Sequence, residues 1–315
     1  MSASGPVAAI DLGTNSTRLL VADSTGASLE RLMRITRLGQ GVDQTGRLSK
    51  EAIQRTVDVL VEFRKVMDHL GVVRFRATAT SAARDAENEA ELARRVKEVL
   101  GAVPEVLQGG EEARLTYLGA TRELDPALGP YLVIDVGGGS TELVGGGPPG
   151  LHAVSLEMGC VRVTERFFEH DPPQQSELDA ARLYVRALVR GALQAEPGLG
   201  GAAQLIGVAG TVSALVRLDQ GLVEYDRRRI HHARLSLSSI EAMAGELASM
   251  SLARRLKWPA LEAERADVII GGVIVLSEAM AALGFEMLTA SEADLLDGVV
   301  AELVSTPPAE EPAVG

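Results

Sequence analysis

Short apolar runs separated by a glycine- and hydroxyl-rich turn open the sequence and predict a β-hairpin. Residues 7–10 (VAAI) and 19–23 (LLVAD) flank this turn, a pattern typical of two paired strands. Apolar residues then recur at helical spacing after Ser49, which predicts a capped helix. A strand is expected over residues 74–78 and a charged amphipathic helix over residues 85–100. The chain is therefore expected to mix strands with helices.

A turn-rich segment in the middle of the chain marks the expected domain boundary. Residues 125–130 (DPALGP) precede a second apolar strand, residues 131–134 (YLVI). A chain of 315 residues is long enough for about two domains. We therefore expect an N-terminal domain of residues 1–126, a C-terminal domain of residues 127–305 and a disordered tail of residues 306–315.

One short segment occurs twice, in the same context. DLGTNST begins at Asp11 and DVGGGST begins at Asp135, and the two agree in their Asp, Gly, Ser and Thr positions. Both follow an apolar strand and precede another. The separation of 124 residues (135 − 11) is too long for a solenoid repeat and indicates two related domains.

The composition of both loops suits phosphate binding. Glycine lets the backbone approach an anion closely, and exposed N–H groups and hydroxyls donate to phosphate oxygens. An ordinary glycine hairpin would explain one loop alone, but explains the pair less well. At the eighth position the loops differ. Arg18 suits a forked contact with phosphate, whereas Glu142 together with Asp135 suits Mg²⁺.

Two further segments carry weaker signals. Gly210 and Thr211 lie in a third glycine turn before a helical pattern, so they would either place a helix N-terminus against an anion or simply pack strand on helix. Glu111 and Glu112 open another expected helix, where acidic residues usually complement the helix dipole. From the sequence alone, that second interpretation is favoured. Residues 225–234 (YDRRRIHHAR) are a basic segment that would either guide a polyanion or remain a solvated loop.

Composition excludes several other functions. The net charge of −12 and the 3% content of aromatic residues disfavour nucleic-acid binding. A single cysteine, Cys160, leaves no internal disulfide. The N-terminus lacks the features of a signal peptide, and the apolar residues 268–285 are interpreted as a buried helix and not as a membrane span. A cytoplasmic protein without a membrane or nucleic-acid partner is expected.

Taken together, several segments resemble the exopolyphosphatase/guanosine pentaphosphatase (Ppx/GppA) family. They occur in family order and are DLGTNSTRLLV, ATSAARDAEN, QGGEEARLTYLG, VIDVGGGSTELV, MGCVRVTERF and GVAGTVSAL, with RADVIIGG beyond them. The resemblance implies an α/β fold of two related domains of the actin-like ATPase and sugar kinase superfamily (ribonuclease H-like), with the active site in the interdomain cleft. The chain looks like the short, two-domain form.

The resemblance also implies roles for individual residues. Glu112 falls on the general base, which reverses the interpretation from the helix dipole. The positions implied for a metal are Asp11, Asp135 and Glu142. Those implied for phosphate are Asn15, Ser16, Thr17, Arg18, Arg84, Gly137, Gly138, Gly139, Ser140, Thr141, Gly210 and Thr211. From its reference pKa of about 4.3, Glu112 is expected to be ionised at neutral pH without special tuning.

The implied reaction is metal-assisted hydrolysis of the terminal phosphate of inorganic polyphosphate. Mg²⁺ is the expected cofactor, with Mn²⁺ as an alternative. Guanosine pentaphosphate (pppGpp) is the alternative substrate, although the scarcity of aromatic residues disfavours a stacked guanine. An ATP-dependent kinase or ATPase of the same superfamily and a non-enzymatic polyphosphate sensor are the remaining alternatives. A homodimer is left open.

Overall fold

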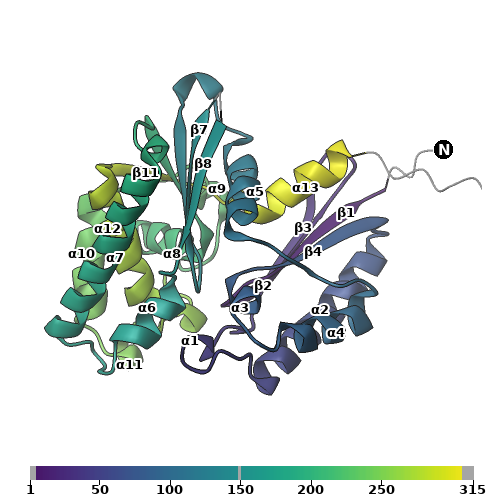
Figure 1. Ribbon diagram of the computed structural model, residues 1–315, viewed down its shortest axis with the longest axis horizontal. Helices are drawn as coiled ribbons and strands as arrows, with labels where there is room; N and C mark the ends of the chain where they lie inside the picture. The colour runs from purple at the N-terminus through teal and green to yellow at the C-terminus, as the bar shows by residue number, and fades with distance from the viewer. Residues whose placement is uncertain (1–4, 148–149, 307–315) are drawn as a thin grey trace, which may run out of the picture.

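The computed structural model describes residues 5–147 and 150–306, and they form two β-sheets with helices packed around them (Figure 1). The first sheet has the strand order β3-β2-β1-β4-β5. Its strands β1, β2 and β3 are antiparallel neighbours, while β4 runs parallel to β1 and β5 runs parallel to β4. The strand bounds are β1 Val7–Leu12, β2 Ser16–Ala22, β3 Ser28–Ile35, β4 Arg74–Ala79 and β5 Glu105–Val106.

The second sheet repeats this topology. Its order is β10-β11-β9-β6-β7-β8, in which β6, β7 and β8 are antiparallel neighbours and β9 runs parallel to both β6 and β11. The strand bounds are β6 Tyr131–Val136, β7 Thr141–Gly147, β8 Gly150–Leu156, β9 Gln204–Val208, β10 Arg234–Ser236 and β11 Met287–Ala290. The order β8-β7-β6-β9-β11 thus matches β3-β2-β1-β4-β5, and the predicted α/β fold with two related halves is confirmed.

The charged helix expected over residues 85–100 starts later than predicted, at Glu89. Helices cover both sheets. In the first half these are α1 Val42–Thr45, α2 Lys50–His69, α3 Ser81–Arg84, α4 Glu89–Leu100 and α5 Gly109–Thr121. The second half contains α6 Cys160–Phe167, α7 Gln175–Ala195, α8 Ala209–Gln220, α9 Arg227–Ile230, α10 Leu237–Ala248, α11 Leu252–Arg255, α12 Ile269–Leu283 and α13 Leu295–Ser305. Short 3₁₀ turns occupy Pro126–Leu128, Pro197–Leu199 and Ala263–Arg265. The Ser49 side chain accepts from the N–H of Ala52, as a helix cap should.

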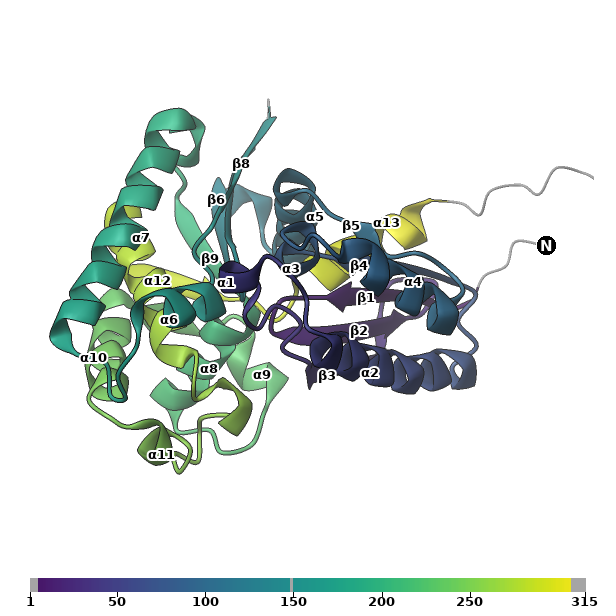
Figure 2. The same ribbon diagram turned by 60° about the horizontal axis from the view of Figure 1, so that its bottom comes forward.

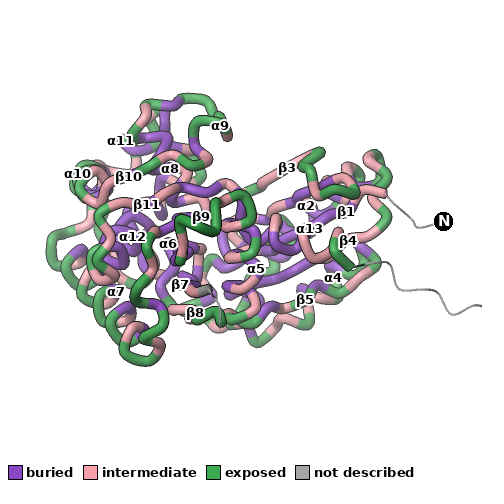
Figure 3. Tube along the Cα trace, turned by 90° about the horizontal axis from the view of Figure 1, so that it is seen from above, coloured by how far each residue is buried: buried purple, intermediate pink, exposed green. Residues whose placement is uncertain are grey.

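The apolar segment expected as a buried helix is α12, whose residues 269–280 are all buried. It packs against α6, α7 and α10 inside the second half. Figure 3 shows the buried stretches running through both halves, with exposed residues around the outside. Within residues 5–147 and 150–306, no helix has the length and apolar composition needed to cross a membrane.

Helices α5 and α13 lie between the two sheets, and α13 crosses back to the first half (Figure 1). Leu296 and Val299 of α13 pack with Ala9 of β1, Leu20 of β2 and Leu115 of α5. The last helix in sequence therefore completes the core under the first sheet. The expected division at residues 126 and 127 stays a prediction, and this packing shows that such a division would separate α13 from the sheet it covers. Residues 307–315 of the expected tail lie outside the described residues.

Candidate active site

The two sequence repeats occupy equivalent places in the two sheets. In each, the Asp is the last residue but one of the first strand of a hairpin and faces, across the strand pair, the residue seven positions later: Asp11 faces Arg18, and Asp135 faces Glu142. The turns also match, because the N–H of Gly13 donates to Ser16 and the N–H of Gly137 donates to Ser140. Arg18 and Glu142 therefore occupy equivalent positions in the two hairpins but carry opposite charges.

In the first hairpin the facing pair is a salt bridge. Nε and Nη2 of Arg18 donate to Oδ2 of Asp11 at 3.0 and 2.8 Å, and Nη1 donates to Asp294, which precedes α13. Burial alone would raise the pKa of Asp294, but Arg18 and Arg31 outweigh it and hold that pKa below its usual range. The guanidinium expected to contact phosphate is thus held between two carboxylates.

In the second hairpin the facing pair consists of two carboxylates. Burial, followed by the charge of Glu142, raises the pKa of Asp135 to about 8. Burial also raises the pKa of Glu142, although hydrogen bonds from Ser155 and Ser140 oppose the shift. Like charges that face each other across a strand pair are destabilising. Without a bound cation, the second hairpin therefore favours a protonated Asp135 at neutral pH.

Glu112 lies in the first turn of α5 and is buried. Its Oε2 accepts from Nη1 of Arg84 at 3.3 Å, and the same nitrogen donates to the carbonyl of Leu107. The pKa of Glu112 is raised well above its usual value, chiefly by burial and then by Glu142 and Asp135. The expectation that Glu112 needs no tuning is therefore wrong for the protein without a bound cation, because the sequence does not show how closely these acids are gathered.

The neighbouring Glu111 behaves as an ordinary first-turn acid. Both oxygens of its carboxylate accept hydrogen bonds from the guanidinium of Arg114 at 2.8 Å, and this contact lowers the pKa of Glu111. The helix-dipole interpretation therefore suits Glu111, while Glu112 points into the interior.

The site residues of both halves meet at a cavity of about 90 Å³. Its wall includes Asp11, Asn15, Ser16, Arg18, Glu112, Asp135, Gly137, Gly138, Ser140, Gly210 and Thr211. Two buried polar atoms in this wall lack hydrogen-bond partners, namely Oδ1 of Asp11 and Nδ2 of Asn15. The first is an acceptor that suits a cation and the second is a donor that suits an anion.

The glycines of the second loop are required by the close approach of the two halves. A Cβ on Gly138 would lie 2.8 Å from Cβ of Thr14, and one on Gly139 would lie 2.7 Å from Oγ of Ser81. Thr14 and Ser81 are hydrogen-bonded to each other at 2.8 Å. The second loop therefore lies directly against the first half, and Gly139 serves this contact instead of lining the cavity.

Two of the expected phosphate contacts point away from the cavity. Thr17 is fully buried and its hydroxyl bonds that of Thr36 at 3.0 Å, while the hydroxyl of Thr141 donates to the carbonyl of Met158 at 2.6 Å. Successive side chains on a strand face opposite sides, so Ser16 and Thr17 cannot both reach the cavity. Glu142 and Arg84 are not part of the cavity wall, but they lie behind it against Ser155 and Glu112.

The third glycine turn does bring a helix N-terminus to the site. Helix α8 begins at Ala209, and Ala209, Gly210 and Thr211 line the cavity. The guanidinium of Arg265 lies against Gly210 and also lines it. Sequence reasoning did not assign Arg265, although it stands at the start of the RADVIIGG segment. Asp294 was not assigned either, because the sequence marks it only as an acidic residue just before a helix.

A larger cavity of about 630 Å³ lies apart from these acids, beside Tyr117, Tyr131 and His152. Among the described residues that line it, none carries a carboxylate or a guanidinium. The smaller cavity between the halves is therefore the candidate active site.

The comparisons with known proteins agree with this geometry. Residues 20–306 match the Ppx/GppA phosphatase family. The chain is 41% identical over 314 residues to "Exopolyphosphatase 2" of Mycobacterium tuberculosis, covering 94% of this chain and 98% of that protein. A crystal structure described as an exopolyphosphatase-like protein superimposes with a TM-score of 0.90 at 38% identity, covering 95% of this chain and 99% of the other. The Ppx/GppA family member of Aquifex aeolicus gives a TM-score of 0.80 at 31% identity, covering 96% and 98%. The chain belongs to the Ppx/GppA phosphatase family.

Proposed function

We propose that the protein is an exopolyphosphatase that hydrolyses the terminal phosphate of inorganic polyphosphate. The observation that carries this proposal is that three buried acids, Asp11, Glu112 and Asp135, line a cavity that also holds a helix N-terminus and an unpaired donor. A fourth buried acid, Glu142, lies behind the cavity wall. Membership of the phosphatase family and likeness to a mycobacterial exopolyphosphatase support it.

In this proposal Glu112 is the general base. Its carboxylate faces the cavity from the first turn of α5, where it can accept a proton from a water molecule placed in line with the terminal phosphorus. A base must be ionised to act, and Arg84 favours the ionised form through its contact with Oε2. Arg84 is therefore proposed to position Glu112, in place of the phosphate contact expected from the sequence.

The remaining donors would hold the phosphate. Nδ2 of Asn15 is buried without a partner, and Ser16 and Ser140 line the cavity. Gly210 and Thr211, in the first turn of α8, also line it. N–H groups at a helix N-terminus favour an anion through both hydrogen bonds and the helix dipole. Arg265 would add a positive charge on the same side.

The acids fit a divalent cation. Asp11 offers an unpartnered oxygen, and Asp135 and Glu142 face each other without a compensating charge, so these three would hold the ion. Mg²⁺ or Mn²⁺ bound there supplies positive charge that stabilises the negative charge on the phosphate oxygens. It would also offset the effect of Asp135 and Glu142 on the pKa of Glu112.

The test is phosphate release from tripolyphosphate, long-chain polyphosphate, pppGpp and ATP, measured side by side with Mg²⁺ and with Mn²⁺. We expect release from both polyphosphates without any acceptor. Preferred turnover of pppGpp would make the protein a guanosine pentaphosphatase, and transfer of phosphate from ATP to a small molecule would make it a kinase. Binding of polyphosphate without turnover at any cation concentration would contradict the proposal.

One observation favours polyphosphate over pppGpp. The described residues that line the cavity include no aromatic side chain, so the cavity offers no surface on which guanine could stack. A cytoplasmic location and a homodimer stay predictions.

A further inference from the structure

The basic segment, residues 225–234, has no role in the site described so far. Arg227, Arg228, Arg229 and Arg234 are at least partly exposed, and within the described residues none has a carboxylate at ion-pair distance, although many other arginines do. The protein as a whole carries a net charge of −12. These unpaired arginines therefore form a positively charged patch on a protein whose net charge is negative.

The backbone beneath these side chains is held in place. The side chain of Asp226 accepts from the N–H of Arg228 and caps α9, and the carbonyl of Arg229 accepts from Gln220 of α8. Ile230, the last residue of α9, is fully buried in the core of the second half. The arginines therefore stand outward from an anchored turn, which limits the entropy lost when they bind an anion.

The segment is connected to the rim of the active-site cavity through Glu292. This carboxylate accepts from Ser213, in the first turns of α8, and from the hydroxyl of Tyr225. Two residues further along the chain, Asp294 holds Arg18 in the cavity wall. In both Figure 2 and Figure 3, α9 lies next to β3 of the first half. The basic segment thus lies at the margin of the cleft.

The arginines of α9 differ in charge balance from those nearer the cavity. Arg18 is paired with Asp11 and Asp294, and Arg31 with Asp294 and Asp297. Arg31 and Arg227 both lie close enough to the Tyr225 hydroxyl to oppose the rise of its pKa, which burial and Glu292 cause. The unpaired positive charge therefore begins at α9, next to Arg31 of the first half.

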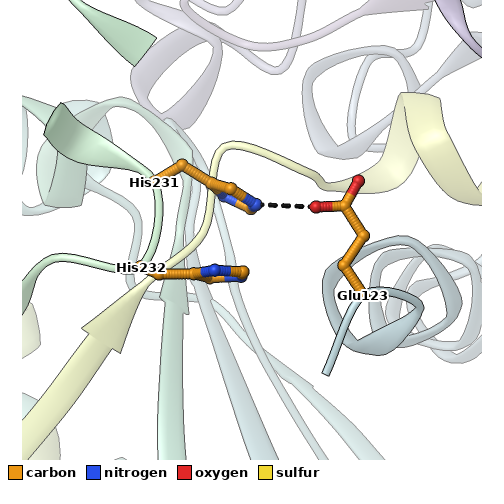
Figure 4. A group of neighbouring side chains, drawn as sticks. All are labelled: Glu123, His231 and His232. Atoms are coloured by element: carbon orange, nitrogen blue, oxygen red, sulfur yellow. Dashed lines mark hydrogen bonds and ion pairs between the residues drawn. The ribbon is translucent and has the colours of Figure 1, made fainter. Parts of the chain in front are cut away.

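The adjacent group of Glu123, His231 and His232 has the composition of a metal site, and its ligand atoms lie within 4.8 Å of one another (Figure 4). However, Nδ1 of His231 accepts from the N–H of Glu292 at 3.0 Å, so the neutral ring carries its proton on Nε2, which donates to Glu123 at 2.9 Å. A histidine that ligates a metal uses one nitrogen as ligand and the other as donor. His231 has no free lone pair, and this group instead anchors the basic segment to the end of α5.

We propose that Arg227, Arg228 and Arg229 form a second binding surface for inorganic polyphosphate, which holds the part of a long chain that remains outside the cavity. The proposal rests on the exopolyphosphatase function proposed above. The cavity of about 90 Å³ accommodates only the end of such a chain. The remaining phosphates carry a negative charge at every repeat, and a row of guanidiniums suits them because each can fork onto phosphate oxygens. A short substrate would not reach this surface.

The test compares R227Q/R228Q/R229Q with K65Q/K97Q/R190Q. The control removes three positive charges that are also exposed and unpaired within the described residues, so both variants have the same net charge. For the α9 variant we expect the KM for long-chain polyphosphate to rise about tenfold at low salt, since steering and binding of polyanions depend strongly on local positive charge. The KM for tripolyphosphate and the kcat for both substrates should change less than about twofold.

Equilibrium binding of long-chain polyphosphate separates the two proposals. Loss of binding in the α9 variant but not in the control supports the surface even if the protein releases no phosphate, an outcome that would overturn only the exopolyphosphatase function. The surface is overturned if the α9 variant binds and turns over long chains like the control, or if its KM rises equally for tripolyphosphate.

Discussion

At the scale of single residues, one exchange in the repeat explains how the two hairpins came to differ. Asp11 and Arg18 neutralise each other across the first strand pair, whereas Asp135 and Glu142 repel each other at the same place in the second. The first pair is therefore neutral in the protein alone, and in our proposal a cation neutralises the second. Glu112 lies outside the repeat and lines the same cavity as Asp11 and Asp135.

Replacing Glu112 by Gln tests the assignment of the base. We expect kcat to fall by about 10²–10⁴-fold, which is the usual contribution of a general base. The fold should be kept or stabilised, because the change removes a buried like charge. Glu111→Gln, one position earlier, is the control, since Glu111 is paired with Arg114 and should be dispensable for turnover. Equal activities of the two variants in a phosphate-release assay would refute the role of Glu112.

The buried acids also predict how stability depends on pH without a cation. The pKa of Asp135 is about 8 in the folded protein and 3.8 without the fold, so the native state retains a proton that the unfolded chain has lost. The unfolding free energy therefore falls as pH rises between these two values. We expect it to be about 1–2 kcal/mol lower at pH 8 than at pH 6 in EDTA, which lowers Tm by a few degrees.

Added Mg²⁺ should restore Tm more at pH 8 than at pH 6, because it binds the ionised acids. Asp135→Asn should weaken both the pH dependence and the response to Mg²⁺. A Tm that stays constant or rises from pH 6 to pH 8 in EDTA would show that these acids are not coupled as described. Thermal melting with and without chelator measures all of these effects.

At the scale of elements, the crossing of α5 and α13 fixes the geometry of the site. The helices touch backbone to backbone: a Cβ on Gly119 of α5 would lie 1.9 Å from the carbonyl oxygen of Asp294, and one on Gly298 would lie 2.0 Å from that of Leu115. Helix α5 carries Glu112, and α13 begins just after Asp294, which holds Arg18. A shift at this crossing would therefore change the distance between the base and Arg18.

Gly119→Ala should consequently reduce both stability and turnover. Overpacking at such a contact costs about 1–3 kcal/mol or more, and kcat should fall with it because Glu112 is displaced. Gly191→Ala in α7 is the matched control, since a Cβ there meets nothing within 4 Å. That variant should be as stable as the parent protein or more stable by about 0.5–1 kcal/mol. Thermal melting and phosphate release compare the two, and equal behaviour would contradict the tight crossing.

At the scale of the whole molecule, ion pairs between the halves hold the cleft closed. Arg162 of α6 contacts Asp43 and Asp85 of the first half, while its Nε donates to the carbonyl of Gly139 at 2.8 Å in the second. Arg37 and Asp267 form a further pair at 2.8 Å. These contacts therefore set how closely the two halves approach each other beside the cavity.

Arg162→Gln should weaken the closed arrangement. We expect the radius of gyration in solution to increase and kcat/KM to fall about tenfold, which corresponds to ~1.4 kcal/mol. Arg166→Gln, one turn later on α6, is the control, because its guanidinium lies over the ring of Tyr184 within the second half. Small-angle scattering that shows no difference between the variants would mean that Arg162 does not hold the halves together.

The local features of this protein could be predicted from its amino-acid sequence. The two hairpins, the helix capped by Ser49 and the buried α12 follow from short-range periodicity, which depends on residues near one another in the chain. The repeat at Asp11 and Asp135 indicated two related halves, and the resemblance carried by the EEARL segment singled out Glu112. These conclusions needed only the order of residues and the chemistry of their side chains.

Contacts between residues that are distant in the sequence became apparent from the three-dimensional structure. It paired Arg18 with Asp294, placed Arg84 on Glu112, turned Thr17 and Thr141 away from the cavity and brought α13 back to the first sheet. The raised pKa of Glu112 likewise depends on acids from three separate segments gathered in a buried place. Burial and charge interactions depend on the distance between residues in space, and that distance cannot be inferred from their separation in the sequence.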